Sequence, residues 1–330
     1  MSPSSSGAQV NAESRYPTAV IANDQIRATI YLPQVERGFY RSTRFDWSGM
    51  IARLEYRGHQ YYGPWFTTTE AGIRDFIYRD ADIVAGLESA AVGPAEEFPI
   101  PQGFASAPAG GTFVKVGVGV LRKPDDSPYS AFAHYDLLDA GQWAVETAAE
   151  SVSFIQTLDD PVSGYGYVYR KDTRLVPGQS ELVISHRLRN TGRRPLETTQ
   201  YNHNFLTFGG AVTGPAVRIV VPFGVQTPRL PEAALATIDG TVIRYVKTLV
   251  DRERVSFPIE GFGAAASDYD VRIENTASGA GVRMRSDRPM VRALLWSIRS
   301  VISFEPFVDV TTEPGATTDW ELRYTYYTLP

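Results

Sequence analysis

The sequence contains no cysteine in its 330 residues. This absence excludes disulfide scaffolds, cysteine nucleophiles, zinc fingers and iron–sulfur sites. It leaves the compartment open, because a chain without cysteine suits both oxidising and reducing surroundings. The first residues, MSPSSSGAQVNAES, lack the charged and apolar regions of a secretion signal and predict a flexible tail over residues 1–14. We therefore expect a soluble protein that is either cytoplasmic or periplasmic or secreted after removal of a signal peptide.

Long hydrophobic runs and concentrated positive charge are also missing. No stretch approaches 18 consecutive apolar residues, which argues against a membrane-spanning segment. The 32 basic residues are outnumbered by 37 acidic ones, and Lys and Arg occur at most in pairs. A nucleic-acid partner requires a concentrated basic surface, so we expect neither nucleic acid nor membrane as a partner.

Several catalytic motifs are absent. The sequence has no HExxH and no G-x-S-x-G, and Gly117-Val118-Gly119 lacks the remaining residues of a phosphate-binding loop. The four histidines, His59, His134, His186 and His203, stand far apart, although three of them could still meet at a zinc ion in the folded chain. Our prediction is that the protein uses no metal and no cofactor.

Short runs rich in Val, Ile, Thr, Tyr and Phe make up most of the chain. They are separated at close intervals by turn residues, including many of the 28 glycines and 22 prolines. Helical patterns are few and short, over Pro231–Ile238 and part of Ala71–Val84. No linker-like segment divides the chain, so residues 15–330 are predicted to form one large antiparallel β domain. Its longest irregular loop is expected at Pro94–Gly111.

Two segments present polar side chains among aromatic ones. In a strand of period two, Tyr201, His203 and Phe205 share one face, while Asn202 and Asn204 share the other. A histidine beside aromatic rings suits a sugar site, because the rings can stack on the sugar and burial can shift the pKa of the histidine. The same pattern also fits a histidine that is simply part of the core.

The second segment, residues 301–310, places Glu305 on the polar side of a strand whose other side is apolar. Its carboxylate is a candidate general base, and a solvent-facing glutamate is the alternative interpretation. Pro306 cannot donate a ladder hydrogen bond, so we expect an edge strand or a strand end at this position.

Taken together, these segments resemble the aldose 1-epimerase (galactose mutarotase-like) family, which has a β-supersandwich fold. Residues 201–205, YNHNF, resemble the family's Asn-His-x-Tyr-Phe strand, and residues 303–306, SFEP, resemble its Leu-Glu-Pro pattern. The resemblance implies an isomerase that opens and recloses a sugar ring by acid–base catalysis. It assigns the general acid to His203 and the base to Glu305. Asp268 matches a substrate-binding aspartate of the family.

The resemblance also shows a departure. Where the family has a histidine in a His-Gly-Phe-Ala-Arg loop, this sequence has Gln102, whose amide donates a hydrogen bond but does not change charge. A carbohydrate-binding protein without turnover therefore stays an alternative, as does a lyase or glycoside-processing enzyme on the same scaffold. The partner expected in every case is a mono- or oligosaccharide, and the oligomeric state is left open. The predicted substrate-binding residues are Asp268, Asn202, Asn204, Gln102, Arg53, Trp65 and Tyr201.

Overall fold

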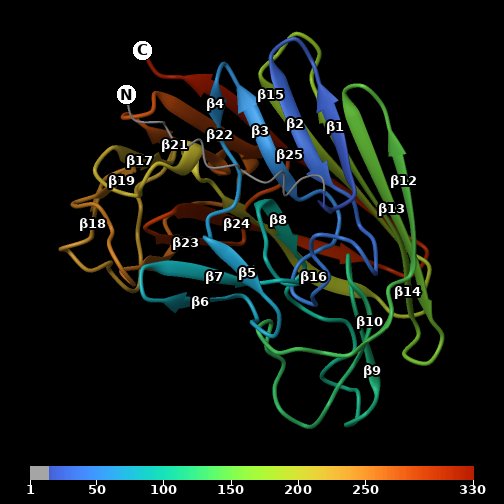
Figure 1. Cartoon of the computed structure of the whole chain (residues 1–330). Coiled ribbons are helices and arrows are strands. Elements are labelled where there is room, and N and C mark those ends of the chain that lie inside the picture. The colour runs from blue at the N-terminus through green and yellow to red at the C-terminus, as the bar shows by residue number, and fades with distance from the viewer. Residues whose placement is uncertain (1–14) are drawn as a thin grey trace, which may run out of the picture.

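The computed structural model describes residues 15–330, so the tail predicted over residues 1–14 lies outside the described residues. Most of the described chain is β-sheet (Figure 1), as the short apolar runs and frequent turns predict. Within the described residues, helical structure is limited to single turns such as η2 (Phe208–Gly210) and η3 (Ala266–Asp268). The two short helices expected from the sequence are wrong, because both segments contribute strands to sheet ladders instead.

The largest sheet has ten strands, all paired antiparallel, in the order β12-β13-β14-β15-β25-β22-β21-β17-β19-β18. Long hairpins make up one half of it, and shorter strands continue it on the other side (Figure 1). The strands are β12 (Gln142–Thr147), β13 (Ser151–Asp160), β14 (Tyr165–Leu175), β15 (Glu181–Asn190), β17 (Val217–Val220), β18 (Ala236–Asp239), β19 (Val242–Tyr245), β21 (Asp270–Asn275), β22 (Ala280–Ser286) and β25 (Thr317–Thr328).

A second, five-stranded sheet carries both predicted catalytic residues. Its order is β20-β23-β24-β16-β8, again antiparallel throughout. The strands are β8 (Gly93–Glu97), β16 (Leu196–Phe205), β20 (Val255–Ile259), β23 (Arg292–Ile298) and β24 (Val301–Thr312). Strand β8 corrects the prediction of one irregular loop over Pro94–Gly111. Glu96 and Glu97 can lie buried within the sheet because cations pair with both carboxylates.

Three smaller sheets surround these two. One is β1 (Thr18–Ala22), β2 (Ile26–Tyr31), β3 (Ile51–Tyr56) and β4 (His59–Gln60), and another is β9 (Thr112–Lys115), β10 (Gly119–Arg122) and β11 (Leu137–Asp139). The third contains β5 (Thr68–Glu70), β6 (Phe76–Arg79) and β7 (Asp82–Gly86), in which β5 and β7 run parallel.

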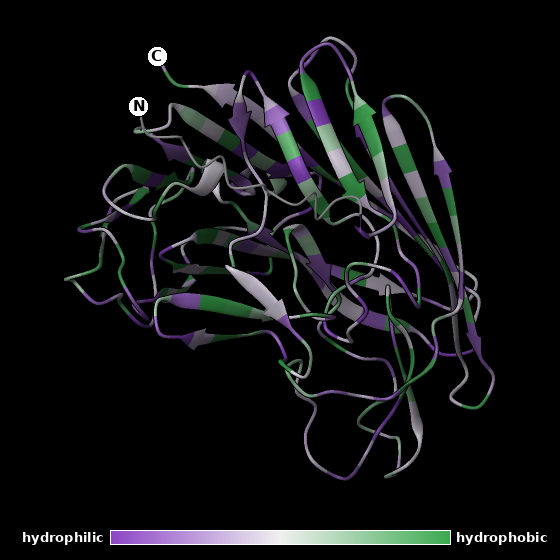
Figure 2. Cartoon of the chain, in the orientation of Figure 1, coloured by the Kyte–Doolittle hydropathy of each residue, from purple (hydrophilic) through white to green (hydrophobic). Residues whose placement is uncertain are grey.

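The main core lies between the ten-stranded and the five-stranded sheets. Phe304, Val308 and Val310 of β24 belong to the same buried cluster as Leu322 and Tyr324 of β25. Figure 2 shows the alternation of hydrophobic and hydrophilic residues along many strands that this packing requires. One face of the five-stranded sheet is therefore covered by the larger sheet, and its other face is available to the loops that build the site. Among residues 15–330, no helix has the length and apolar character needed to cross a membrane.

Candidate active site

A cavity of about 280 Å³ lies on the free face of the five-stranded sheet. Side chains that lie opposite each other on neighbouring strands form its floor. Glu305 of β24 is opposite Leu294 of β23, and two residues further along β23, Trp296 is opposite Ser256 of β20. Segments from elsewhere in the chain complete the wall. The residues that line the cavity are Arg44, Trp65, Asp75, Phe76, Phe132, His203, Phe205, Arg254, Ser256, Leu294, Trp296 and Glu305.

His203 and Glu305 meet on this floor. The register of β16 with β24 runs through Tyr201↔Phe307 and resumes at the bridge Leu206↔Ile302, which sets His203 opposite Glu305. The His203 Nε2 atom lies 3.1 Å from Oε1 of Glu305, and both side chains are almost fully buried. Two groups able to exchange protons therefore lie side by side at the bottom of a cavity.

The position of this pair corrects two expectations about the β24 segment. Glu305 is not on a solvent-facing surface, since only 3% of the residue is exposed. Strand β24 is not an edge strand either, because β23 and β16 flank it. Pro306 lies within the gap where the β16–β24 ladder is interrupted, so its missing donor is accommodated inside the sheet and not at its edge.

Burial changes the protonation of both groups. Loss of water raises the pKa of the Glu305 carboxyl to about 8, although the positive charge of Arg44 opposes this shift. Burial also lowers the pKa of the His203 imidazole well below its usual value, and Arg44 adds to the effect. Neither the Nδ1 atom of His203 nor the Oε1 atom of Glu305 has a hydrogen-bond partner among the described residues. At neutral pH Glu305 therefore carries a proton and His203 is neutral.

Aromatic rings surround the pair. The ring of Phe205 stacks on His203 at 3.8 Å between centroids and on Trp65 at 5.4 Å. Trp296 contacts His203 edge-on at 5.1 Å, and Phe76 contacts Trp65 at 5.0 Å. Such a wall suits the C–H faces of a sugar ring, which pack on aromatic surfaces while the hydroxyls remain free for polar groups.

Arg44 is a cavity residue that the sequence analysis missed. Its guanidinium lies between the rings of Phe45, at 4.5 Å, and Phe132, at 4.6 Å. It donates to Glu97 at 3.0 Å and to the hydroxyl of Tyr201 at 3.2 Å. No motif marks Arg44, which comes from an irregular segment before β3, and only the tertiary structure brings it beside Glu305.

The carboxylate of Glu97 organises this side of the cavity. Lys115 lies 3.2 Å from it, and the Tyr201 hydroxyl also donates to it. Burial by itself raises the pKa of Glu97, but the charges of Lys115 and Arg44 lower it overall, so Glu97 is ionised. Tyr201, which was predicted to bind substrate, is held in this network and is not among the residues that line the cavity.

Asn202 and Asn204 lie on the other face of β16, as the period of two predicts. Their amide groups donate to the Tyr324 hydroxyl at 3.0 Å and to the Phe304 carbonyl at 2.8 Å, respectively. Both residues are fully buried between the two large sheets. The structure therefore places these two predicted sugar ligands away from the cavity.

Three further residues predicted to bind substrate also lie outside the cavity lining. Gln102 is buried and donates to the carbonyls of Ile100 and Glu197, at 2.9 and 3.0 Å. Asp268 is in η3 and accepts from the backbone N–H of Gly263. Arg53 is exposed on β3. Of the seven predicted binding residues, only Trp65 lines the cavity with His203 and Glu305.

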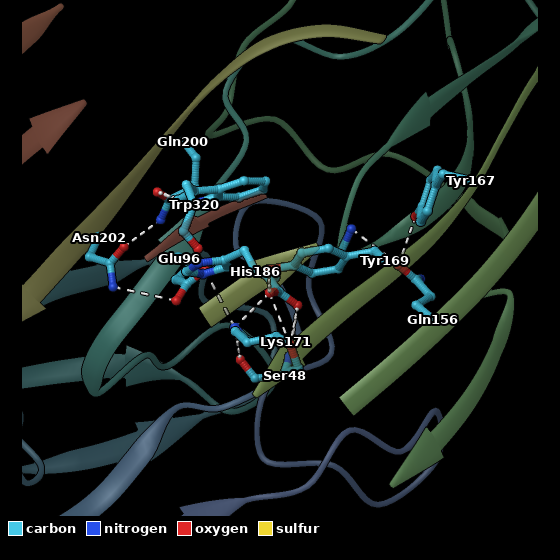
Figure 3. Close-up of polar contacts among 12 residues, drawn as sticks. Ser48, Glu96, Gln156, Tyr167, Tyr169, Lys171, His186, Gln200, Asn202 and Trp320 are labelled. Atoms are coloured by element: carbon cyan, nitrogen blue, oxygen red, sulfur yellow. Dashed lines mark hydrogen bonds and ion pairs between the residues drawn. The ribbon is translucent and has the colours of Figure 1, made fainter. Parts of the chain in front are cut away.

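A separate charged network is buried beneath β16 (Figure 3). Lys171 donates to Asp46 at 2.7 Å and to the Ser48 carbonyl at 2.6 Å, and it lies 3.6 Å from Glu96. His186 stacks on Trp320 at 4.5 Å and pairs with Glu96 at 2.8 Å. Glu96 and Glu97 are consecutive residues of β8, so their side chains point to opposite faces of the strand. Glu96 therefore belongs to the Lys171 network on one face, and Glu97 belongs to the Arg44 network on the other.

The histidines do not assemble a metal site. Within residues 15–330, no group of three or more His, Asp or Glu side chains is arranged so that it could hold a metal ion. His186 pairs with Glu96 and His203 lies beside Glu305, so the two buried histidines have different partners.

Comparison with known proteins identifies the fold. No family model matches the chain, and no curated protein matches it in sequence. Solved structures do match over nearly the whole length. A galactose mutarotase-like protein from Clostridium acetobutylicum is 10% identical, with a TM-score of 0.56 and coverage of 96% of this chain and 97% of the other.

Two more similar structures carry related names. A galactose mutarotase related enzyme from Lactobacillus acidophilus is 11% identical, with a TM-score of 0.54 and coverage of 94% and 98%. An aldose epimerase homologue from C. elegans is 16% identical, with a TM-score of 0.51 and coverage of 95% and 99%. The chain thus has the galactose mutarotase-like β-sandwich fold, and at these identities the likeness extends to the fold alone.

Proposed function

We propose that this chain, which has the galactose mutarotase-like fold, is an aldose 1-epimerase-like enzyme that interconverts the anomers of a sugar. The observation that carries the proposal is the buried His203–Glu305 pair, 3.1 Å apart, on the floor of an aromatic cavity. Mutarotation requires one group that accepts the proton of the anomeric hydroxyl and one that protonates the ring oxygen. A protonated carboxyl beside a neutral imidazole supplies one group of each kind.

The proton balance of the reaction follows from the pair. One partner removes the proton from O1 while the other donates its proton to the ring oxygen, so the C1–O5 bond breaks and an open-chain aldehyde forms. Rotation about C1–C2 presents the other face of the carbonyl. The ring oxygen then attacks C1 as the two proton transfers run in reverse, and the protein returns to its starting state.

The resemblance implies that His203 donates and Glu305 accepts, whereas burial in this structure favours the proton on Glu305. The two arrangements contain the same number of protons and differ only in the position of one proton across a 3.1 Å contact. We propose that Glu305 is the acid in the state that first meets the sugar, with His203 as the base.

Proton NMR exchange measurements of anomer equilibration test this proposal on glucose, galactose, xylose, arabinose and their acidic derivatives. Each well-placed acid or base contributes on the order of 10²–10⁴ in rate, so Glu305→Gln and His203→Ala should each lose the acceleration. Glu313→Gln, which changes an exposed carboxylate just after the end of β24, is the matched control. An intact rate in Glu305→Gln would contradict the proposal.

A second candidate function is sugar binding without turnover. Gln102 favours it, because the residue that stands in place of the family's histidine is fixed by the Ile100 and Glu197 carbonyls and does not reach the cavity lining. Sugar-dependent line broadening without any acceleration of anomer exchange would support this candidate over the enzyme.

A further inference from the structure

Arg254 lines the cavity without a charged partner. It is an exposed residue that stands one position before β20, and no ion pair or hydrogen bond of its side chain occurs within residues 15–330. The other cavity arginine, Arg44, is engaged on several sides by Glu97, Asp75 and Tyr201. A guanidinium that is left free at the wall of a cavity is available to a ligand.

The charges that face Arg254 do not neutralise it. Within the cavity, Asp75 lies 3.8 Å from Arg44, and burial raises the pKa of both Asp75 and Glu305 toward the neutral form. In the adjoining hollow, Glu253 pairs with Lys247. That hollow also contains Glu232 and Arg252, which offset each other in sign. Among the residues that line the cavity, Arg254 is therefore the arginine without an acidic partner, in a protein whose net charge is −5.

Arg254 stands where two hollows meet. The second hollow, of about 320 Å³, shares Phe76 and Arg254 with the cavity that contains His203 and Glu305. A ligand that begins at the catalytic pair and extends past Phe76 therefore passes the guanidinium. The site is longer than the acid–base pair itself requires.

The sheet register gives the span between the two ends. Glu305 pairs with Leu294, which pairs with Pro258, and Arg254 precedes Pro258 by four residues on the same strand direction. At roughly 3.4 Å per residue this is about 14 Å along the strand direction, and the two steps from β24 to β20 add roughly 10 Å across the sheet. The backbone positions of Glu305 and Arg254 are therefore roughly 17 Å apart, a gap that their side chains and the ligand bridge together.

We infer that the sugar handled by this site carries an acidic group, a carboxylate or a phosphate, and that Arg254 binds this group while the anomeric centre lies at His203 and Glu305. The inference rests on the proposed function for the position of the anomeric centre. A guanidinium presents a planar fork of donors that matches the oxygens of a carboxylate or phosphate, whereas hydroxyls alone do not require a full charge. Phe76 and Trp296 then pack against the ring between the two ends.

The test compares matched neutral and acidic sugars. Anomer exchange is measured by NMR for glucose, glucuronate and glucose 6-phosphate with the intact protein, Arg254→Gln and Arg272→Gln. Arg272 is exposed on β21, lines neither hollow and is the charge-matched control. We expect kcat/KM for an acidic sugar to exceed that for glucose at least tenfold. Arg254→Gln should lower the acidic value by about 10- to 100-fold more than the glucose value, and Arg272→Gln should cause less than a threefold change.

The two acidic sugars separate the two sources of charge. A preference for glucuronate identifies a sugar acid, and a preference for glucose 6-phosphate identifies a sugar phosphate. Equal use of glucose, or equal losses for all sugars in Arg254→Gln, would overturn the inference while leaving mutarotation intact.

Binding measurements keep the two proposals distinguishable. If no sugar is accelerated, the proposed function fails, and calorimetric titration with glucuronate and glucose 6-phosphate still tests Arg254. Tighter binding of an acidic sugar than of glucose, lost in Arg254→Gln and weakened by salt, would support the inference. Absence of acidic-sugar binding to the intact protein would overturn it.

Discussion

The imidazole of His203 lies flat against the ring of Phe205, two residues further along β16, with 3.8 Å between the ring centroids and 10° between the ring planes. Residues two apart in a strand point to the same face, so this contact follows from the strand itself. It removes water from one side of the imidazole. Trp296 and Phe45 approach from other directions, and together the rings exclude the solvent that would stabilise a charged histidine.

Replacing this aromatic face should change the protonation of His203. Phe205→Leu keeps an apolar residue but opens part of the cavity floor to water, so we expect the pKa of His203 to rise toward its ordinary value of 6.5. An NMR titration of the histidine resonances measures this change, and the exposed His134 is an internal reference in the same spectra. A pKa of His203 that falls or stays unchanged in Phe205→Leu would contradict the role given to the stacked ring.

Glu305 should make the stability of the protein depend on pH. Its pKa is about 8 in the folded chain and near 4.5 in the unfolded chain, so the fold binds this proton more tightly. The stabilisation is fully present below pH 4.5 and is lost as the pH rises through 8. Glu305→Gln, which stays neutral, should therefore become more stable than the wild type by up to about 4 kcal/mol between pH 5 and pH 8.

Urea unfolding at several pH values measures this difference. The exposed variant Glu313→Gln should follow the wild type across the same range. A constant difference between Glu305→Gln and the wild type from pH 5 to pH 8 would show that Glu305 is ionised in the fold.

Lys171 is essential to the charge balance beneath β16. It is 1% exposed and is the cation between Asp46, at 2.7 Å, and Glu96, at 3.6 Å. Lys171→Met leaves Asp46 in particular as a buried carboxylate without its cation, so we expect a loss of about 3–5 kcal/mol in the free energy of unfolding. The double variant Asp46→Asn/Lys171→Met should recover part of this loss. Chemical denaturation of the wild type, the two single variants Asp46→Asn and Lys171→Met, and the double variant gives the coupling energy, and strictly additive losses would contradict the pairing.

Gly93 fixes the start of β8, which runs beside His203. Its φ is +67°, and a Cβ atom there would lie 2.5 Å from the backbone nitrogen of Ile51 and 2.7 Å from its oxygen. Gly93→Ala should therefore cost about 2–4 kcal/mol in stability, more than the backbone conformation alone would cost. Gly178→Ala, with φ of +69° and no atom within 4 Å, is the matched control and should cost only about 1 kcal/mol. Equal thermal unfolding midpoints for the two variants would argue against the close approach.

One part of the site, the side-chain arrangement along β16, could be predicted because side chains alternate between the two faces of a strand. The period of two places His203 and Phe205 on one face and Asn202 and Asn204 on the other, and the structure has them so. What the alternation leaves undecided is which face meets the core and which meets the cavity. The assignment of both asparagines to sugar binding depended on that choice, and their amides instead hydrogen-bond within the core.

Other site residues gave no signal in the sequence. Arg44, Asp75, Phe132 and Arg254 come from four separate segments and carry no motif, and the structure brings them to one cavity. Gln102 and Asp268, which were chosen by resemblance, fall outside its lining, and so does Arg53. Their neighbours in space are set by loop paths that local patterns do not encode.

The amino-acid sequence by itself determined the β architecture, because alternation and turn residues act over a few neighbouring positions. It also determined that His203 and Phe205 share a face. Only the tertiary structure decided that β24 lies inside a sheet, that Glu305 is buried against His203, and that Arg254 is left without a partner. These outcomes depend on strand order and loop closure between segments far apart in the chain, and burial then sets the protonation of the groups that are brought together.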